Sequence, residues 1–211
     1  MKLVAISDTH NLHHSFGKLP QGDVIIHAGD FTTWGKTGEV RQFRNWFASL
    51  PYAHKICIAG NHDRCMEHMF FLKDDFKNAG ITYLQDSSVE INGIRFYGSP
   101  RTPEFCDFAF MYERGQAHWE GIPDNTNILI THGPPQGILD LCPDGRNVGC
   151  VELLERTHEL ADLKYHIFGH IHEAYGIQGK YVNASNHTML WKNSGGPGFT
   201  GKSFEPITLG L

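Results

Sequence analysis

The stretch IIHAGDFT, residues Ile25–Thr32, sets the pattern on which the whole chain is built. An apolar run rich in β-branched residues, typical of a buried strand, ends at a glycine that is followed by a carboxylate. A charged side chain directly after such a strand lies at the edge of a sheet, where loops build binding sites. Gly-Asp is also common turn chemistry, so Asp30 taken alone is better explained as a turn residue.

The same arrangement recurs at four other strand ends. Apolar, strand-like runs are followed directly by polar side chains at Asp8 and His10, at Asn61 and His62, at His132, and at His170 and His172. Taken alone, each residue has an ordinary explanation as a turn residue, a helix cap or a hydrogen-bonded loop histidine. As an ordered set, each at a strand end, they are poorly explained by chance and indicate one shared site.

The order of predicted elements places these strand ends together. Strands alternate with helices in the first half of the chain, which favours parallel pairing, and parallel strands bring their carboxyl ends to one edge. The Asn92-Gly93 pair predicts a later antiparallel hairpin with a type I′ turn. The expected strands are residues 2–7, 23–27, 54–59, 81–84, 127–131, 165–168, 174–177, 181–184 and 188–191, with the hairpin at 89–96, helices at 38–50, 67–79 and 151–161, and a glycine-rich loop at 194–201.

Length and composition predict a single soluble domain over residues 1–211. The chain of 211 residues is 40% hydrophobic, as in ordinary globular proteins, and it has no apolar run long enough to span a bilayer. The first residues lack a basic segment, an apolar core and a cleavage site, so a cytoplasmic protein is expected. Its five cysteines form no CxxC pair, which speaks against a zinc ribbon and favours reduced thiols.

The charge pattern narrows the class of partner. The net charge is -5 with both signs mixed and no block of lysine and arginine, so we expect neither long nucleic acid nor a membrane as a partner. A small nucleotide remains compatible with this pattern. The oligomeric state is left open by the sequence.

The donor atoms at the five strand ends point to metal ions. Imidazole, carboxylate and amide groups without thiolate suit manganese, iron or zinc. Even with His62 set aside, seven such donors exceed what one ion takes from a protein when water and substrate also need positions. Two ions that share one bridging carboxylate would use all seven.

The set of motifs resembles the calcineurin-like metallophosphoesterases, from the first strand to about Asn183. The motifs that carry this resemblance are Asp8-x-His10, Gly29-Asp30, Gly60-Asn61-His62-Asp63, His132 and Gly169-His170-x-His172. Further stretches are similar to the branch of metallophosphoesterase-domain-containing proteins, which are class III-type phosphodiesterases: Gly98-Ser99-Pro100, Thr131–Pro135, Val148–Leu154 and Asn183-Ala184-Ser185.

The resemblance implies a fold and a ligand set. The fold would be a four-layer α/β/β/α sandwich of two mixed sheets flanked by helices, with a dinuclear metal site. One ion would be held by Asp8, His10, Asp30 and His172, and the other by Asp30, Asn61, His132 and His170. His62 would be the catalytic histidine. The chain departs from many relatives at Asn11, where they have glycine.

The activity implied is hydrolysis of small phosphodiesters, with cyclic nucleotides as candidates. Two ions about 3.5–4 Å apart lower the pKa of a water between them, and the resulting hydroxide attacks phosphorus in line. Manganese is the expected metal, with iron or zinc as alternatives. The catalytic residues expected are His62, which serves the leaving oxygen as proton donor or cation, and Asp63, which either orients His62 or caps the following helix. Alternatives are a broad-specificity phosphomonoesterase and a non-catalytic metal-binding scaffold.

The substrate side is predicted from the aromatic loop at residues 100–112. Arg101 follows Gly98-Ser99-Pro100 and is a candidate for binding a phosphate oxygen, although a surface arginine without such a role is the plainer explanation. The aromatic residues of this loop either form a wall against a base or pack onto the domain; they are Phe105, Phe108, Phe110 and Tyr112.

Overall fold

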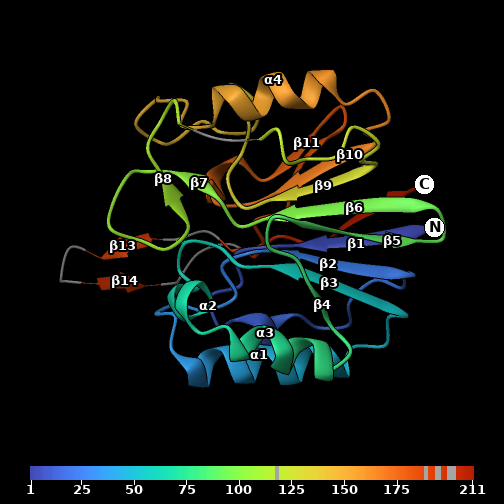
Figure 1. The fold of residues 1–211 in the computed structure, drawn as a ribbon. Coiled ribbons are helices and arrows are strands. Elements are labelled where there is room, and N and C mark those ends of the chain that lie inside the picture. The colour runs from blue at the N-terminus through green and yellow to red at the C-terminus, as the bar shows by residue number, and fades with distance from the viewer. Residues whose placement is uncertain (117–118, 188–189, 193–195, 199–202) are drawn as a thin grey trace.

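The chain folds into four layers, with helices outside two face-to-face sheets (Figure 1). This computed structural model describes residues 1–116, 119–187, 190–192, 196–198 and 203–211. The predicted α/β/β/α sandwich of two mixed sheets is confirmed. Within the part of the chain that the structure describes, no helix is long and apolar enough to cross a membrane.

The first sheet has five strands in the order β15-β1-β2-β3-β4. Strands β1 to β4 run parallel, as expected where helices separate successive strands, and β15 pairs antiparallel with β1. The two labelled chain ends therefore lie side by side (Figure 1). The bounds are β1 Lys2–Ile6, β2 Val24–Ala28, β3 His54–Ile58, β4 Thr82–Tyr83 and β15 Ile207–Gly210.

The second sheet has six strands in the order β11-β12-β10-β9-β6-β5. Strands β12, β10, β9 and β6 are parallel to their neighbours, and the edge strands β11 and β5 are antiparallel. The predicted hairpin joins β5 to β6 through Asn92 and Gly93, which both have positive φ angles of 52° and 75°. The bounds are β5 Ser87–Ile91, β6 Ile94–Ser99, β9 Ile128–Thr131, β10 Tyr165–Phe168, β11 Gly176–Gln178 and β12 Tyr181–Asn183.

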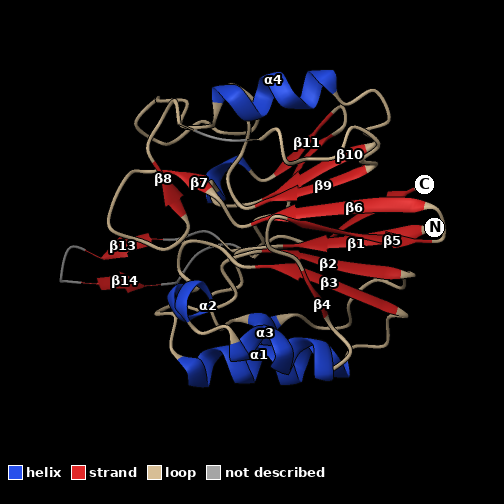
Figure 2. Cartoon of the chain, viewed as in Figure 1, coloured by secondary structure: helices blue, strands red, loops and turns tan. Residues whose placement is uncertain are grey.

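Helices cover the outer face of each sheet (Figure 2). The helices α1 and α3 lie on the first sheet and α4 lies on the second. The remaining elements are α1 Thr37–Ser49, α2 Arg64–His68, α3 Phe71–Asn78, α4 Val151–Glu159, the 3-10 turns η1 His13–Ser15 and η2 His172–Ala174, and the short strands β7 Thr102–Pro103, β8 Met111–Tyr112, β13 Leu190–Lys192 and β14 Gly196–Gly198.

Alternate side chains of a strand point to opposite faces of the sheet, and here both faces are covered. In β1, Leu3 and Ala5 point into the core between the sheets, while Val4 and Ile6 point toward the core under α1 and α3. All four side chains are fully buried. A strand covered on both faces reads as a continuous apolar run, which is what the sequence of β1 shows after Lys2.

One predicted helix is wrong in its extent. The single helix expected over residues 67–79 is two helices, α2 and α3, because the backbone leaves the helical region at Met69, where φ is -103° and ψ is 80°. Most of the glycine-rich loop expected at 194–201 lies outside the described residues. The part that the structure describes, residues 196–198, forms β14.

Candidate metal centre

The predicted strand ends meet at one edge of the two sheets. The backbone N–H groups of Asp8 and His10 donate to the carbonyls of Gly29 and Asp30 at 2.9 and 3.0 Å, which fixes the end of β1 beside that of β2. A parallel bridge from Ser7 to Ser185 joins the first sheet to the segment after β12. The carboxyl ends of both sheets therefore share one site, as the parallel pairing predicted.

One group of donors consists of Asp8, His10 and His172. Their candidate ligand atoms all lie within 4.8 Å of one another, and all three side chains are buried. Nε2 of His172 lies 3.3 Å from Oδ1 of Asp8 and 3.4 Å from Nε2 of His10. These three residues are those predicted for one ion, together with Asp30.

A second group consists of Asp30, His132 and His170, again with ligand atoms within 4.8 Å of one another. Nε2 of His132 lies 2.8 Å from Oδ1 of Asn61 and 3.4 Å from Oδ2 of Asp30. The structure thus brings together the residues predicted for the other ion. His62 forms a third cluster with His10 and Asp30, so its ring also lies at the centre.

Asp30 lies between the two groups. Its Oδ2 atom is 3.4 Å from Nε2 of His132 and 3.8 Å from Nε2 of His10. Its Oδ1 atom accepts a hydrogen bond of 2.7 Å from the backbone N–H of His62. A single carboxylate oxygen therefore faces both donor groups, and the other fastens the loop that carries His62.

The tautomers of the ring nitrogens fit metal binding. Nδ1 of His10 lies 3.0 Å from the carbonyl of Thr32, and Nδ1 of His132 lies 3.0 Å from the carbonyl of Ala28. A carbonyl only accepts, so each Nδ1 carries a proton and each ring turns its Nε2 atom toward the centre. Metal-ligating histidines usually donate their other N–H in this way.

Donor spacing supports the same conclusion. Two ligands about 2.1 Å from one tetrahedral ion lie about 3.4 Å apart, close to the separations of 3.3 and 3.4 Å around Nε2 of His172. The nitrogen and oxygen donors present therefore fit divalent transition metals.

At the two buried aspartates of the site, burial and the neighbouring histidines shift the pKa in opposite directions. Burial raises the pKa of Asp8 and Asp30, but the neighbouring histidines outweigh it, so both carboxyls lie well below their usual range. Burial lowers the pKa of His10 and of His170 to about 3, which keeps both rings neutral and able to bind a metal.

His132 shows the reverse balance. Burial lowers its pKa, but the carboxylate of Asp30 outweighs this and raises the pKa of His132 to about 9. A proton on Nε2 would satisfy both Asp30 and Asn61, which face that atom with oxygen acceptors. A metal ion at this position would replace the proton and satisfy the same oxygens.

Four residues at the site have positive φ angles, a backbone conformation that residues other than glycine rarely adopt. Asp8, His10, Asp30 and His170 have positive φ angles of 54°, 39°, 57° and 71°. Such conformations persist where the surroundings hold them, and they are frequent at functional sites. Gly60 is required by close approach, because a Cβ there would collide with Asp30.

The carboxylate of Asp63 has other partners than the two expected, which were His62 and the first turn of the following helix. Its Oδ1 accepts from the N–H and the hydroxyl of Thr32 at 2.9 and 2.7 Å, and its Oδ2 accepts from the N–H of Gly60 at 2.8 Å and of Phe31 at 3.3 Å. The carboxylate makes no cap hydrogen bond to α2, and Nδ1 of His62 is held by the carbonyl of Thr33 at 2.9 Å. Asp63 therefore ties the loops after β2 and β3 together.

The structure does not bring Arg101 to the centre. Its guanidinium pairs with Asp86 at 3.1 Å, and it does not line the cleft of about 600 Å³ that opens over the candidate metal ligands. The arginines that line this cleft are Arg114 and Arg146. Sequence reasoning missed both, because they lie in irregular segments without a motif.

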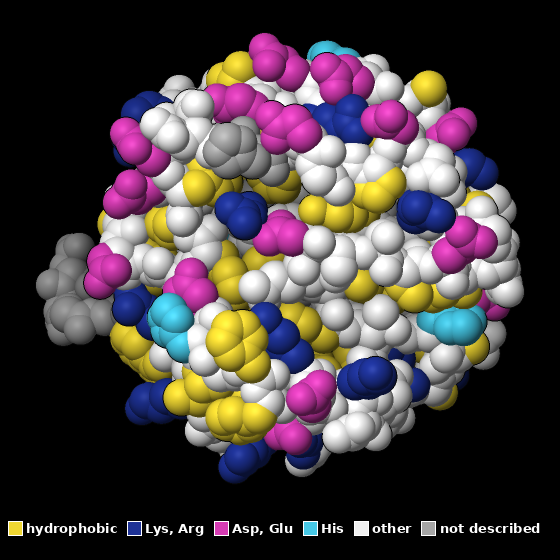
Figure 3. Space-filling view, in the orientation of Figure 1, with side chains coloured by type: hydrophobic (Ala, Val, Ile, Leu, Met, Phe, Trp, Pro, Cys, Tyr) yellow, Lys and Arg dark blue, Asp and Glu magenta, His cyan; other side chains and the backbone are white. Residues whose placement is uncertain are grey.

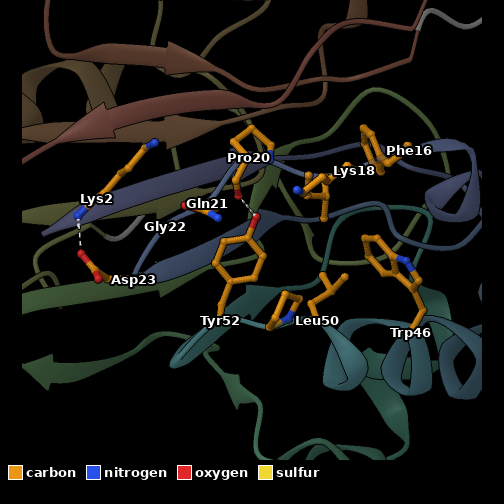
Figure 4. A pocket seen from close by; sticks show the side chains of 13 residues that line it. Lys2, Phe16, Lys18, Pro20, Gln21, Gly22, Asp23, Trp46, Leu50 and Tyr52 are labelled. Carbon is orange, nitrogen blue, oxygen red and sulfur yellow. Dashed lines mark hydrogen bonds between the residues drawn. The ribbon is translucent and has the colours of Figure 1, made fainter.

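A second hollow, of about 750 Å³, lies away from this chemistry (Figure 4). It is lined by Lys2, which begins β1, and by Asp23, which precedes β2, so it lies near the amino ends of these strands. Two hydrogen bonds join residues of its lining: Tyr52 donates to the carbonyl of Pro20 at 2.5 Å, and the N–H of Lys2 donates to Asp23 at 2.7 Å. The candidate metal centre lies at the opposite, carboxyl ends.

Residues 1–174 match the family model described as calcineurin-like phosphoesterase. The chain belongs to the calcineurin-like phosphoesterase family. It is 42% identical to metallophosphoesterase domain-containing protein 1 of Homo sapiens and of Mus musculus, over 90% of this chain and 68% of each relative. The resemblance drawn from the five motifs is thereby confirmed.

Solved structures support the fold. The crystal structure of the protein TT1561 of Thermus thermophilus is similar with a TM-score of 0.59 at 13% identity, covering 89% of this chain and 92% of that one. At this identity the likeness concerns the fold alone. Family and geometry together make the chain a metallophosphoesterase whose buried histidine and aspartate groups are consistent with a dinuclear metal site.

Proposed function

We propose that the chain hydrolyses small phosphodiesters with two divalent ions, manganese first among the candidates and iron or zinc as alternatives. The observation that carries this proposal is the position of Oδ2 of Asp30, between two donor groups and at the base of a cleft of about 600 Å³. His62 lines the same cleft. A substrate phosphate above Asp30 would therefore lie next to an imidazole.

The residues divide into ligands and one proton donor. Asp8, His10, Asp30 and His172 would hold one ion, and Asp30, Asn61, His132 and His170 the other. Such ions supply a nucleophile at neutral pH and neutralise charge on the phosphoryl oxygens.

The proton donor is His62. Its Nδ1–H donates to the carbonyl of Thr33 at 2.9 Å, which fixes the ring and leaves Nε2 for the substrate. As water oxygen bonds to phosphorus and the ester P–O bond breaks, a proton on Nε2 passes to the leaving oxygen.

The charge of the cleft favours diesters over monoesters. Among its described lining residues the permanent cations are Arg114 and Arg146, and both are already engaged. Arg114 donates to the carbonyls of Val148 and Gly149 at 2.9 and 3.3 Å, and Arg146 pairs with Asp144 at 2.6 Å. A monoanionic diester needs less positive charge than a dianionic monoester, and its two organic groups suit the apolar lining.

The outer surface supports a small substrate. On the face shown in Figure 3, acidic and basic side chains are interspersed, and no broad area of one sign covers it. Long nucleic acid is bound through arrays of basic side chains that follow the phosphates. We therefore expect a small molecule, in the cytoplasm, rather than a polymer or a membrane.

The decisive experiment compares two nitrophenyl esters. Protein stripped with a chelator and reloaded with Mn²⁺, Fe²⁺ or Zn²⁺ is given bis-p-nitrophenyl phosphate or p-nitrophenyl phosphate. We expect kcat/KM at least about tenfold higher for the diester, a difference of about 1.4 kcal/mol, and no turnover in the stripped protein. The opposite preference would identify a phosphomonoesterase, and full metal occupancy without turnover on either ester would identify a non-catalytic scaffold.

A further inference from the structure

Phe105 and Phe108 form an aromatic surface beside the metal centre. Their rings stack with centroids 5.4 Å apart and an interplanar angle of 26°. The ring of Phe108 lies 4.8 Å from that of His62, and the ring of Phe105 lies 5.2 Å from that of His170. All four residues line the cleft of about 600 Å³. The aromatic pair is therefore continuous with the side chains that would meet the phosphate.

The loop separates these two rings from its other aromatic residues. Phe110 is buried at 7% exposure, and Tyr112 packs edge-on against Trp119 at 6.1 Å. Phe105, by contrast, is 49% exposed. Packing onto the domain thus accounts for Phe110 and Tyr112 but leaves a face of Phe105 open to the cleft.

The aromatic surface is held in place by the loop that carries the site. The N–H of Ala109 donates to the carbonyl of Asn61 at 3.1 Å. The guanidinium of Arg64 lies 5.2 Å from the centroid of the Phe108 ring. Because both contacts come from the segment after β3, the aromatic surface has a fixed position relative to His62. A fixed surface costs a ligand less ordering than a mobile one.

We propose that Phe105 and Phe108 select phosphodiesters that carry a planar ring, such as a nucleobase, on one esterified group. The proposal rests on the proposed function and names the substrate class of the same site. A ring stacks on an aromatic face through dispersion and its quadrupole, whatever its hydrogen-bonding pattern. The cleft volume lies within the range of about 300–1,000 Å³ typical of small-molecule sites, so it holds more than a phosphate group.

The test uses two ligands that cannot be hydrolysed. Phenylphosphonate and cyclohexylphosphonate carry the same charged head and six-membered rings of similar size, but only the first ring is flat. Their Kd values are measured by calorimetry on the manganese-loaded protein. We expect phenylphosphonate to bind at least about fivefold more tightly, the lower end of what one stacked base is worth.

Leucine variants separate stacking from simple apolar contact. Phe105→Leu and Phe108→Leu keep the apolar cover and remove the ring, so the preference is expected to fall to within about twofold. Phe71→Leu is the matched control, since Phe71 is 52% exposed on α3 and does not line the cleft. Equal affinities in the parent, or a preference that survives in both cleft variants, would overturn the proposal.

Hydrolysis of bis-p-nitrophenyl phosphate by the same preparations keeps the two proposals apart. A preference for the flat ring without turnover would leave the aromatic surface standing and remove the phosphodiesterase function. Turnover of the diester without a preference for phenylphosphonate would support the phosphodiesterase function and remove the role of the aromatic surface. Because the phosphonate measurement does not depend on chemistry, a slow variant still gives an answer.

Discussion

Ser185 donates a hydrogen bond of 2.9 Å from its hydroxyl to Oδ2 of Asp8. The same oxygen accepts from the backbone N–H of His170 at 3.0 Å. That N–H also lies 3.1 Å from Oδ1 of Asp8, which in turn lies 3.3 Å from Nε2 of His172. Oδ2 of Asp8 is therefore fixed by the segments that follow β12 and β10. Ser185 would thus act on the candidate metal centre by orienting a predicted ligand rather than by touching an ion.

Replacing this serine should weaken the binding of one ion. Ser185→Ala is expected to lower the affinity of the ion held by Asp8 and His172 about 10- to 100-fold, the usual cost of losing a partner that orients a ligand. Calorimetric titration with Mn²⁺ measures both affinities. Ser99→Ala is the matched control, because the hydroxyl of buried Ser99 donates to the carboxylate of Asp86 at 2.8 Å and not to a predicted ligand. Equal effects of the two substitutions would contradict the orienting role.

Replacing Asp30 should release more ions than replacing one of the histidines. Its Oδ2 lies close to Nε2 of both His10 and His132, so Asp30→Asn is expected to weaken the binding of both ions. His10→Gln or His132→Gln should weaken mainly one. Metal content after dialysis distinguishes these outcomes: near zero for Asp30→Asn and about one ion per chain for each histidine variant. One retained ion in Asp30→Asn would mean that the carboxylate is not shared.

Much of the site was predictable because it depends on local signals. Each apolar strand ends at a polar residue, and parallel strands place such ends side by side whatever the details of packing. Asp30 and His132 could therefore be predicted to converge although they are far apart in sequence. Their neighbour Ser185 could not be assigned a role, since its contact with Asp8 requires the two sheets to meet at the bridge from Ser7.

The walls of the cleft were not predictable for a different reason. Residues 101–116 and 133–150 are irregular apart from the short strands β7 and β8, so no periodicity indicates which of their side chains face inward. Their positions are set by tertiary hydrogen bonds, such as those from Gly137 and Gly149 to the buried carboxylate of Asp140, both at 2.9 Å. For this reason no sequence signal points to Arg114 and Arg146, the arginines that line the cleft.

Asp63 should prove structural. Asp63→Asn keeps the shape but turns an NH₂ group toward backbone donors, which leaves buried N–H groups without acceptors and should cost about 1–3 kcal/mol for each. Thermal unfolding of metal-free protein measures this loss. The exposed Asp74 provides the control variant Asp74→Asn, which should unfold like the parent. Unchanged stability with an altered pH profile of kcat would instead support orientation of His62.

Buried His166 should make the fold sensitive to acid. Burial, with a smaller effect of Lys180, lowers its pKa to about 3, against about 6.5 in the unfolded chain. Between these values the unfolded chain binds the extra proton, so stability is complete above about pH 6.5 and falls as the pH drops toward 3. At pH 5 this one group should cost roughly 2 kcal/mol.

Urea unfolding of metal-free protein at pH 7.5 and 5 tests the effect of His166. In His166→Gln, which keeps a partner for the hydroxyl of Thr131, the loss of stability between the two pH values should shrink by about that amount. His68, whose side chain is 77% exposed, supplies the control His68→Gln with an unchanged loss. An equal loss in parent and His166→Gln would show that this ring is not held neutral.

His62 should be needed for turnover but not for metal. Its ring is fixed by Thr33 and packs against Phe108, while the seven other donors remain in place when it is removed. His62→Ala is expected to keep close to two ions per chain and to lose about 10²–10⁴ in kcat. The loss should be greater for an alkyl diester, whose leaving oxygen needs a proton, than for a nitrophenyl diester. Equal losses on both would favour a cationic role over proton donation, and hydrolysis at the parental rate would remove His62 from the mechanism.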